Sequence, residues 1–179
     1  MKRLLVANRG EIACRILTTA RELGIATVAI YSDADRLALH PTYADRAIAL
    51  GPDDPAPAYL DMERVIAAAH AAGADAIHPG YGFLAESAAF AAAVEKAGLT
   101  FVGPSPEAIT AMGDKLRARE LAERCKLPVL PATTLSGDAK KDAKAAATVG
   151  FPLIVKAAAG GGGRGMRVVR DKAELAEAI

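Results

Sequence analysis

Residues 156–166 combine a lysine with a glycine-rich loop, a composition suited to holding phosphate groups. Five glycines stand in six positions, and the loop reads Gly160, Gly161, Gly162, Gly163, Arg164 and Gly165. Glycine permits positive φ, so successive backbone N–H groups can converge on an anion. Lys156 ends the apolar run 153–155, from which its ammonium can reach phosphate oxygens. The pattern predicts a cover over nucleotide phosphates. The alternatives are a flexible linker and a lysine that snorkels at a strand edge.

Lys115 is a second candidate for anion binding. It follows Gly113 and Asp114, and Asp114 is a plausible N-cap, so Lys115 would stand at the first position of a helix. Free N–H groups and a partial positive charge gather there, and a lysine reinforces them. On this local pattern alone, a solvated surface lysine is the better interpretation.

A third segment, residues 78–86, could contact a ligand with its backbone. Gly80 and Gly82 allow close approach, while Tyr81 and Phe83 offer apolar walls. Glu86 could orient a polar group of the ligand. The alternative is a strand-to-helix turn with aromatic core residues.

Residues 8–11 occupy the place of a dinucleotide fingerprint but do not match one. Gly10 is the only glycine among them, so the GxGxxG pattern fails. Asp33 and Asp35, after the second predicted strand, stand where a ribose-binding acid would be, but without the glycines they predict no dinucleotide site.

The first 113 residues alternate between short apolar strands and helical patterns. Such alternation predicts an α/β domain with a parallel sheet covered by helices on both faces. Ligands bind such sheets beyond the C-terminal ends of the strands, where residues 7–11 and 78–86 would lie. The predicted strands are 3–7, 27–31, 47–50, 75–78 and 100–102, and the predicted helices are 11–23, 60–72, 88–97 and 106–113.

From residue 114 the pattern changes, so the sequence predicts one domain over 1–113 and an incomplete second one over 114–179. Helices are expected at 115–125 and 139–149. Strands 153–156 and 166–169 flank the glycine loop, which favours an antiparallel hairpin over a P-loop. Asp171 and Glu174 then resemble a capping box at the start of another helix.

Composition excludes several classes of function. The net charge is +1, 4% of residues are aromatic and tryptophan is absent, so a nucleic-acid partner is not expected. No run approaches 18 apolar residues, so no membrane span is expected either. Cys14 and Cys125 have no metal-ligand or CxxC spacing. We expect both to be reduced and mostly buried, in a cytoplasmic type of protein.

Four segments together resemble the biotin carboxylase family, in the family's order and spacing: residues 5–13, 76–86, 112–115 and 156–166. The resemblance covers the whole chain. It implies a Rossmann-like pre-ATP-grasp domain with a parallel sheet, followed by the truncated start of an ATP-grasp domain. The family carboxylates biotin in acyl-CoA carboxylases and pyruvate carboxylase, using bicarbonate and MgATP.

The same resemblance implies roles for individual residues. Lys115, Lys156 and the glycine loop would contact ATP, while Tyr81 and Gly82 would lie near biotin. No catalytic residue and no Mg²⁺ ligand would lie within these residues, so the chain alone would be inactive. The implied partners are a biotin carboxyl carrier, a carboxyltransferase, and a second copy bound through the first helix, including Arg15. The implied location is the cytoplasm, or the mitochondrion after removal of a transit peptide.

Two departures from the family pattern are visible, and neither removes a charge. Ala159 stands where bacterial acetyl-CoA carboxylase components often have glycine, and Ala85 stands where serine is common. Two other functions stay open. One is a different ATP-grasp ligase, and the other is a non-catalytic nucleotide-binding or dimerisation module.

Overall fold

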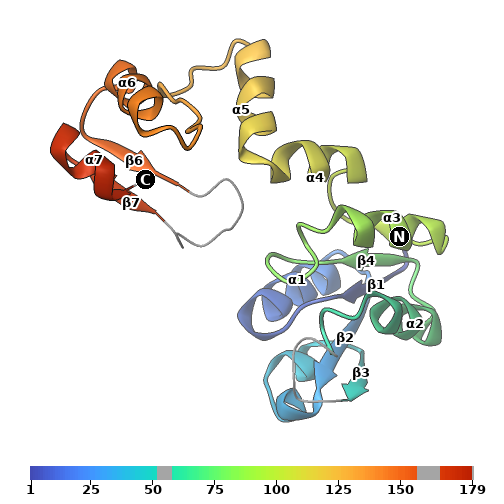
Figure 1. Ribbon diagram of the computed structural model, residues 1–179. Helices are drawn as coiled ribbons and strands as arrows, with labels where there is room; N and C mark the ends of the chain where they lie inside the picture. Colours follow the sequence, from blue (N-terminus) through green and yellow to red (C-terminus); the bar gives the residue numbers. More distant parts are fainter. Residues whose placement is uncertain (52–57, 157–165, 179) are drawn as a thin grey trace. The chain divides into compact units, whose positions relative to one another are not determined.

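The computed structural model describes residues 1–51, 58–156 and 166–178. The chain divides into two compact units, Met1–Thr110 and Ala111–Ile179. The first unit is an α/β layer structure and the second is a small α+β unit (Figure 1). Among the described residues, no helix is both long enough and apolar enough to cross a bilayer.

The described part of the first unit contains one five-stranded parallel sheet in the order β3-β2-β1-β4-β5. β1 stands where the order reverses, because β2 and β3 lie on one side of it and β4 and β5 on the other. The bounds agree with the predicted strands to within one residue, and they are β1 Arg3–Val6, β2 Ala26–Ser32, β3 Arg46–Gly51, β4 Ala76–His78 and β5 Thr100–Phe101.

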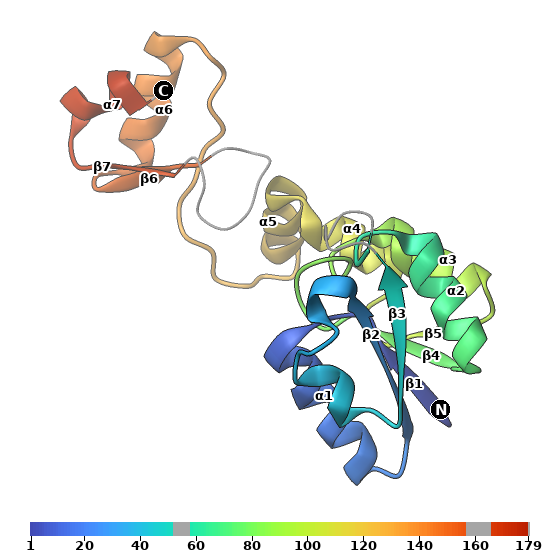
Figure 2. The ribbon, with the colours of Figure 1, turned by 90° about the horizontal axis from the view of Figure 1, so that it is seen from below.

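Helices cover both faces of this sheet, as predicted (Figure 2). Side chains alternate across a strand, so Leu5 of β1 joins the core under α2 and α3, while Val6 joins the core under α1. On α1, Leu17 and Ala20 follow Ala13 at helical spacing, and all three are buried. The helices are α1 Gly10–Glu22, α2 Met62–Ala72, α3 Ala88–Lys96 and α4 Pro106–Gly113.

Local signals set the bounds of these helices. The Asp61 carboxylate accepts from the Arg64 N–H at 3.0 Å and caps α2, and Gly73 ends that helix with φ of 65°. Ser87 caps α3 by accepting from the Phe90 N–H at 3.2 Å. Two single 3₁₀ turns, η1 Asp33–Asp35 and η2 His40–Tyr43, connect β2 to β3.

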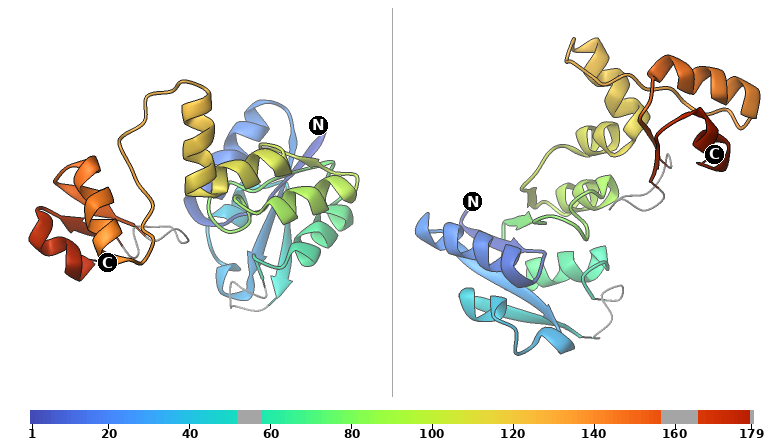
Figure 3. Two further views of the ribbon diagram at one scale, coloured as in Figure 1. Left: turned by 45° about the horizontal axis from the view of Figure 1, so that its top comes forward. Right: turned by 90° about the vertical axis from the view of Figure 1, so that its left-hand side faces the viewer.

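The described part of the second unit contains an antiparallel hairpin, as the sequence predicted. Leu153 pairs with Val169 in register. Val169 and Leu175 form a small core with Ala146 of the neighbouring helix. The helix that follows the hairpin packs beside that neighbouring helix (Figure 3). The elements are α5 Lys115–Arg124, α6 Ala139–Val149, β6 Leu153–Val155, β7 Arg167–Val169 and α7 Lys172–Ala178.

Side-chain caps hold this unit together locally. Asp114 accepts from the N–H groups of Leu116 and Arg117, both at 2.9 Å, and caps α5 as predicted. Asp142 is almost fully buried and accepts from the backbone N–H and the hydroxyl of Ser136. The backbone bond from Ser136 is the largest cause that lowers the pKa of Asp142.

The burial predicted for the cysteines is wrong for Cys125, which is exposed, whereas Cys14 is half-buried. Cys125 follows the last turn of α5, and that helix has no buried residue. The helical periodicity of the segment around Cys125 therefore does not indicate packing against a core among the described residues.

Candidate functional site

The loops after β1 and β4 meet where the strand order of the first unit reverses. β1 and β4 are parallel neighbours, so their C-terminal ends lie at the same edge of the sheet. The chain leaves β1 toward the face covered by α1 and leaves β4 toward the opposite face. This divergence opens a crevice, the usual ligand position in open α/β sheets. The prediction that residues 7–11 and 78–86 lie beyond the C-terminal ends of the strands is confirmed.

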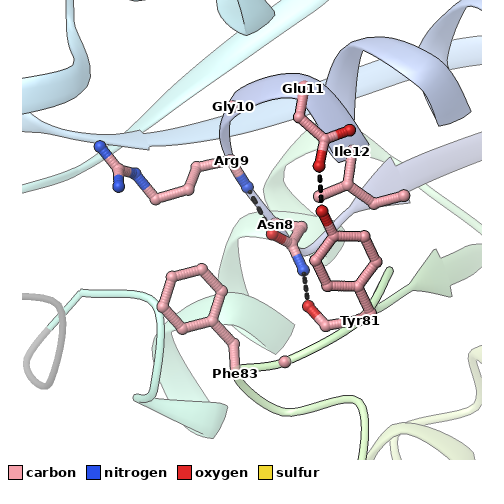
Figure 4. Close-up of a pocket in the computed structure, with 8 residues that line it drawn as sticks. Asn8, Arg9, Gly10, Glu11, Ile12, Tyr81 and Phe83 are labelled. Atoms are coloured by element: carbon pink, nitrogen blue, oxygen red, sulfur yellow. Dashed lines mark hydrogen bonds between the residues drawn. The ribbon is translucent and has the colours of Figure 1, made fainter. Parts of the chain in front are cut away.

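A pocket of about 410 Å³ occupies this crevice (Figure 4). One wall comes from the turn into α1 and the other from the loop after β4. Its lining residues are Asn8, Arg9, Gly10, Glu11, Ile12, Tyr81, Gly82 and Phe83. The pocket therefore combines aromatic surface with backbone and charged groups, a mixture typical of small-molecule sites.

Asn8 fastens the two loops together. Its side chain is buried, and its amide nitrogen donates to the carbonyl oxygens of Pro79 and Tyr81, both at 2.7 Å. Its own oxygen accepts from the Arg9 N–H at 2.9 Å. Gly80 is required beside it, because a Cβ there would lie 2.8 Å from the Asn8 nitrogen.

The aromatic residues of the loop after β4 lie on either side of the pocket. Tyr81 is 60% exposed, and its hydroxyl donates to the carboxylate of Glu11 on α1. That hydrogen bond is the largest cause that raises the pKa of Tyr81. Phe83 has a positive φ of 41° and stacks on Tyr59, with ring centroids 5.3 Å apart. Both rings are thus held by contacts from other elements.

The buried carboxylate of Asp35 is the centre of a hydrogen-bonded network that holds Arg9 and Tyr59, and Tyr59 packs against Phe83. No pattern in the sequence predicted this network. Asp35 accepts from Arg9 Nε at 2.5 Å and from the Tyr59 hydroxyl at 2.6 Å. The bond from Arg9 is the largest cause that lowers the pKa of Asp35. Burial, with a smaller contribution from Asp35, raises the pKa of Tyr59 to about 12.

This network explains why a ribose-binding interpretation of Asp35 fails. Both carboxylate oxygens already accept hydrogen bonds from Arg9 or Tyr59. Asp33 is exposed and two residues away. The signal that could have revealed the network is the pairing of a cation after β1 with an acid after the adjacent β2, since parallel neighbours end at the same edge.

Asp35→Asn is expected to lower the free energy of unfolding by about 2 kcal/mol at pH 7. Bonds to charged groups contribute about 1.5–3 kcal/mol, and solvent screens the half-exposed Arg9. Because the pKa of Asp35 is lowered in the fold, its carboxylate stabilises the protein above the unfolded-state pKa, near 4. That stabilisation is lost as pH falls through the lower folded-state pKa. The difference from wild type should therefore shrink below about pH 4.

Urea denaturation between pH 7 and pH 3 measures this effect. Asp33→Asn is the matched control, and it should change stability by less than about 0.5 kcal/mol. Equal losses in the two variants would show that the Arg9–Asp35–Tyr59 network contributes nothing special.

The remaining predicted site residues are not among the pocket-lining residues or fall outside the described residues. Gly160, Gly161, Gly162, Gly163, Arg164 and Gly165 belong to the second group. Lys115 is the first residue of α5 and is exposed. Glu86 is exposed and is not among the pocket-lining residues. Arg15 is exposed on α1 and donates to the Thr19 hydroxyl.

Lys156 is exposed and directly follows β6, beside an apolar sheet face that the sequence analysis missed. Leu153, Val155 and Val169 turn toward α6 and α7. The opposite face carries Ile154 and Val168, which pair in register and are 52% and 51% exposed. Met166 is 51% exposed. Strict alternation in 153–156 is the signal that places Ile154 and Lys156 on one face.

Comparison with known proteins decides the family. Residues 1–109 match the family model described as the biotin carboxylase N-terminal domain. The chain belongs to the biotin carboxylase family. Residues 114–179 match a second model, described as the ATP-binding domain of the carbamoyl-phosphate synthase L chain. These matches confirm both the family resemblance and the fold class inferred from the sequence.

Curated biotin carboxylases are similar over nearly the entire chain. That of Pseudomonas aeruginosa is 50% identical over 98% of this chain and 39% of its own length. The propionyl-CoA carboxylase alpha chain of Ruegeria pomeroyi is 48% identical over 98% of this chain and 26% of its own length. The chain thus spans about two fifths of the biotin carboxylases it matches, at 39% and 40% of their lengths.

Solved structures give the same assignment. The biotin carboxylase of Campylobacter jejuni, in a complex described as beta-gamma-ATP, is 46% identical with a TM-score of 0.91, over 99% of this chain and 40% of that chain. The biotin carboxylase domain of Hydrogenobacter thermophilus 2-oxoglutarate carboxylase, a dimer with MgADP, ADP and bicarbonate, is 46% identical with a TM-score of 0.88. The similarity covers 98% of this chain and 39% of the H. thermophilus chain.

Proposed function

We propose that this chain forms the N-terminal part of an ATP-dependent biotin carboxylase. Bicarbonate attacks the γ-phosphate of MgATP, which gives ADP and carboxyphosphate. Carboxyphosphate breaks down to CO₂ and phosphate. The phosphate accepts the proton of a ureido N–H of biotin, and that nitrogen bonds to the CO₂ carbon. The observation that carries the proposal is the similarity to the C. jejuni enzyme, which extends through both units at 46% identity.

The proposed nucleotide-binding residues belong to the second unit. The open face of Ile154, Met166 and Val168 supplies apolar surface suited to an adenine ring. Lys156, two residues beyond Ile154, adds a cation for phosphate oxygens at the edge of that face. Lys115 adds another cation at the start of α5. The glycine loop, Gly160 to Gly165, would close over the phosphates.

Bound Mg²⁺ would neutralise charge that develops on the transferring phosphate. Among the described residues, no group of three or more His, Cys, Asp or Glu side chains could hold a metal ion. We place its ligands outside this segment, as the family resemblance implies.

The proposed biotin site is the pocket of the first unit. Tyr81 and Gly82 line it and would contact biotin, the first with an exposed ring and the second with backbone that has no side chain. Glu86, exposed at the end of the same loop, is the weaker candidate for a ligand contact. The proposed partners are a biotin carboxyl carrier, a carboxyltransferase and a second copy of the chain through α1 and Arg15, in the cytoplasm.

We propose a functional boundary at residue 113, between a pre-ATP-grasp domain and the start of an ATP-grasp domain. Two observations support it. The compact units divide after Thr110, and the two family matches cover 1–109 and 114–179. The 113/114 position also coincides with the end of α4 and the Asp114 cap of α5.

A different ATP-grasp ligase is the second candidate, because residues 114–179 match a carbamoyl-phosphate synthase domain. Phosphate release by the full-length polypeptide that carries this chain discriminates the two. A biotin carboxylase cleaves ATP only with bicarbonate and is stimulated by free biotin. Turnover that required ammonia or an amino acid instead would overturn the proposal.

The isolated 179-residue chain is expected to fold over residues 1–113 but not to turn over ATP. The first unit has a sheet covered on both faces. The described sheet of the second unit is one hairpin, and isolated hairpins are marginal in water. We expect at best millimolar nucleotide binding, about −4 kcal/mol. Calorimetric titration with MgATP and a phosphate-release assay test this, and micromolar affinity or measurable turnover would contradict it.

A further inference from the structure

The loop that carries Tyr81 and Gly82 has an unusual backbone that needs outside support. Gly80 and Gly82 have φ of 68° and 65°, and Phe83, which is not a glycine, has φ of 41°. Three left-handed residues within four positions form no regular element. Within the loop, the Gly80 N–H donates to His78 Nδ1 at 3.0 Å and the Ala85 N–H donates to the Gly82 carbonyl at 2.8 Å, so these bonds hold its two ends but not the Tyr81 carbonyl.

Asn8 supplies the missing support at the centre of the loop. Both hydrogens of its amide nitrogen are used, one on the Pro79 carbonyl and one on the Tyr81 carbonyl, each at 2.7 Å. The bond to Tyr81 matters most for the pocket, because a peptide unit is planar and trans. Holding the Tyr81 carbonyl therefore also fixes the direction of the Gly82 N–H.

Only an asparagine-like side chain fits this role. Aspartate has no donor, and its charge would face two carbonyl oxygens at close range. The position is 3% exposed, so water does not readily replace the lost bonds. The Asn8 oxygen is also committed, because it accepts from the Arg9 N–H. Asn8 is thus placed by its own loop before it contacts the other.

We infer that Asn8 is a positioning residue for biotin, which acts by holding the Tyr81–Gly82 peptide in its binding orientation. The inference rests on the proposed function, since it assigns biotin to this pocket. Asn8 is not among the proposed nucleotide-binding residues, which all lie from 115 onward in the sequence. Its loss should therefore affect biotin and leave ATP unaffected.

The test is steady-state kinetics of the full-length carboxylase that carries this chain, with free biotin as the varied substrate. Asn8→Asp should raise the KM for biotin by about tenfold or more, because small displacements of a binding group have large kinetic effects. Asn8→Ser keeps one uncharged donor, so the KM of this variant for biotin should rise by only about threefold. The KM for ATP should change by less than about twofold in both variants.

Thr27→Val is the matched control for lost stability. Thr27 is 1% exposed and lies at the start of β2, opposite the pocket, where its hydroxyl donates to Asp45 at 2.9 Å. The KM of the Thr27→Val variant for biotin should stay at the wild-type value, even when the thermal stability of this variant falls as far as that of Asn8→Ser.

The positioning role of Asn8 and the proposed function would be overturned by different results. A wild-type KM for biotin in folded Asn8→Ser, or equal rises in the KM values for biotin and ATP, would remove the positioning role alone. Absence of biotin-stimulated ATP cleavage in the wild-type enzyme would remove the proposed function, and this inference with it.

Discussion

Lys156→Ala is expected to weaken ATP binding by about ten- to a hundredfold in the full-length enzyme. Removal of a charge-assisted contact to phosphate costs about 1.5–3 kcal/mol. Lys156 is exposed at the end of β6, on the face that carries Ile154 and Val168, so the change should leave the core of the second unit intact. Calorimetric titration with ATP measures the loss directly.

Lys144→Ala provides the control for this change. Lys144 is exposed on α6 in the same unit and is not part of the open sheet face. The Lys144→Ala substitution removes the same charge from the unit, but the affinity for ATP should stay within about twofold of wild type. Wild-type affinity in Lys156→Ala as well would show that Lys156 only extends its ammonium into water at a strand edge.

Gly80→Ala should lower the free energy of unfolding of the first unit by about 3 kcal/mol. A left-handed backbone costs a residue with a Cβ about 1–2 kcal/mol, and Gly80 has φ of 68°. The new methyl would also lie 2.8 Å from Asn8 Nδ2 and 3.2 Å from its Cγ. Overpacking of this kind costs about 1–3 kcal/mol, because Asn8 is held by three hydrogen bonds.

Gly98→Ala separates the backbone cost from the steric one. Gly98 has φ of 76°, and a Cβ there meets nothing within 4 Å. Its loss should be about 1 kcal/mol. Urea denaturation of both variants measures the difference, and equal losses would mean that the Asn8–Gly80 packing is not tight.

Most of the fold followed from local patterns in the sequence. The N-cap at Asp114 and the left-handed glycine at position 73 depend on neighbouring residues alone, so they mark helix ends reliably. Alternating apolar runs and helical periodicity likewise gave the parallel sheet and its two covered faces. The parallel arrangement of the strands, in turn, predicts that the loops after β1 and β4 lie at one edge of the sheet.

The site was less predictable because its contacts join distant residues. Asp35 is 26 positions from Arg9 and 24 from Tyr59, and no local pattern links them. Its position after β2 resembles that of a ribose-binding acid, but nothing in the local sequence indicated its ion pair with Arg9. The two amide bonds of Asn8 span 71 and 73 positions. Strand order must be known before such partners can be matched.

The roles assigned to Lys115, Tyr81 and Gly82 came from family resemblance. The local sequence pattern alone favours a solvated surface lysine at position 115. In the structure, Lys115 is exposed at the first position of α5. The open apolar face of the β6–β7 hairpin is the structural addition to that account. It puts Lys156 beside the exposed apolar surface that we propose as a contact for the adenine ring.

Transfer of labelled bicarbonate carbon tests the central claim most directly. The full-length polypeptide that carries this chain is incubated with radiolabelled bicarbonate, MgATP and free biotin. The account predicts acid-labile label in biotin, in amounts equal to the ADP formed. ATP cleavage that leaves biotin unlabelled and instead requires ammonia or an amino acid would contradict it.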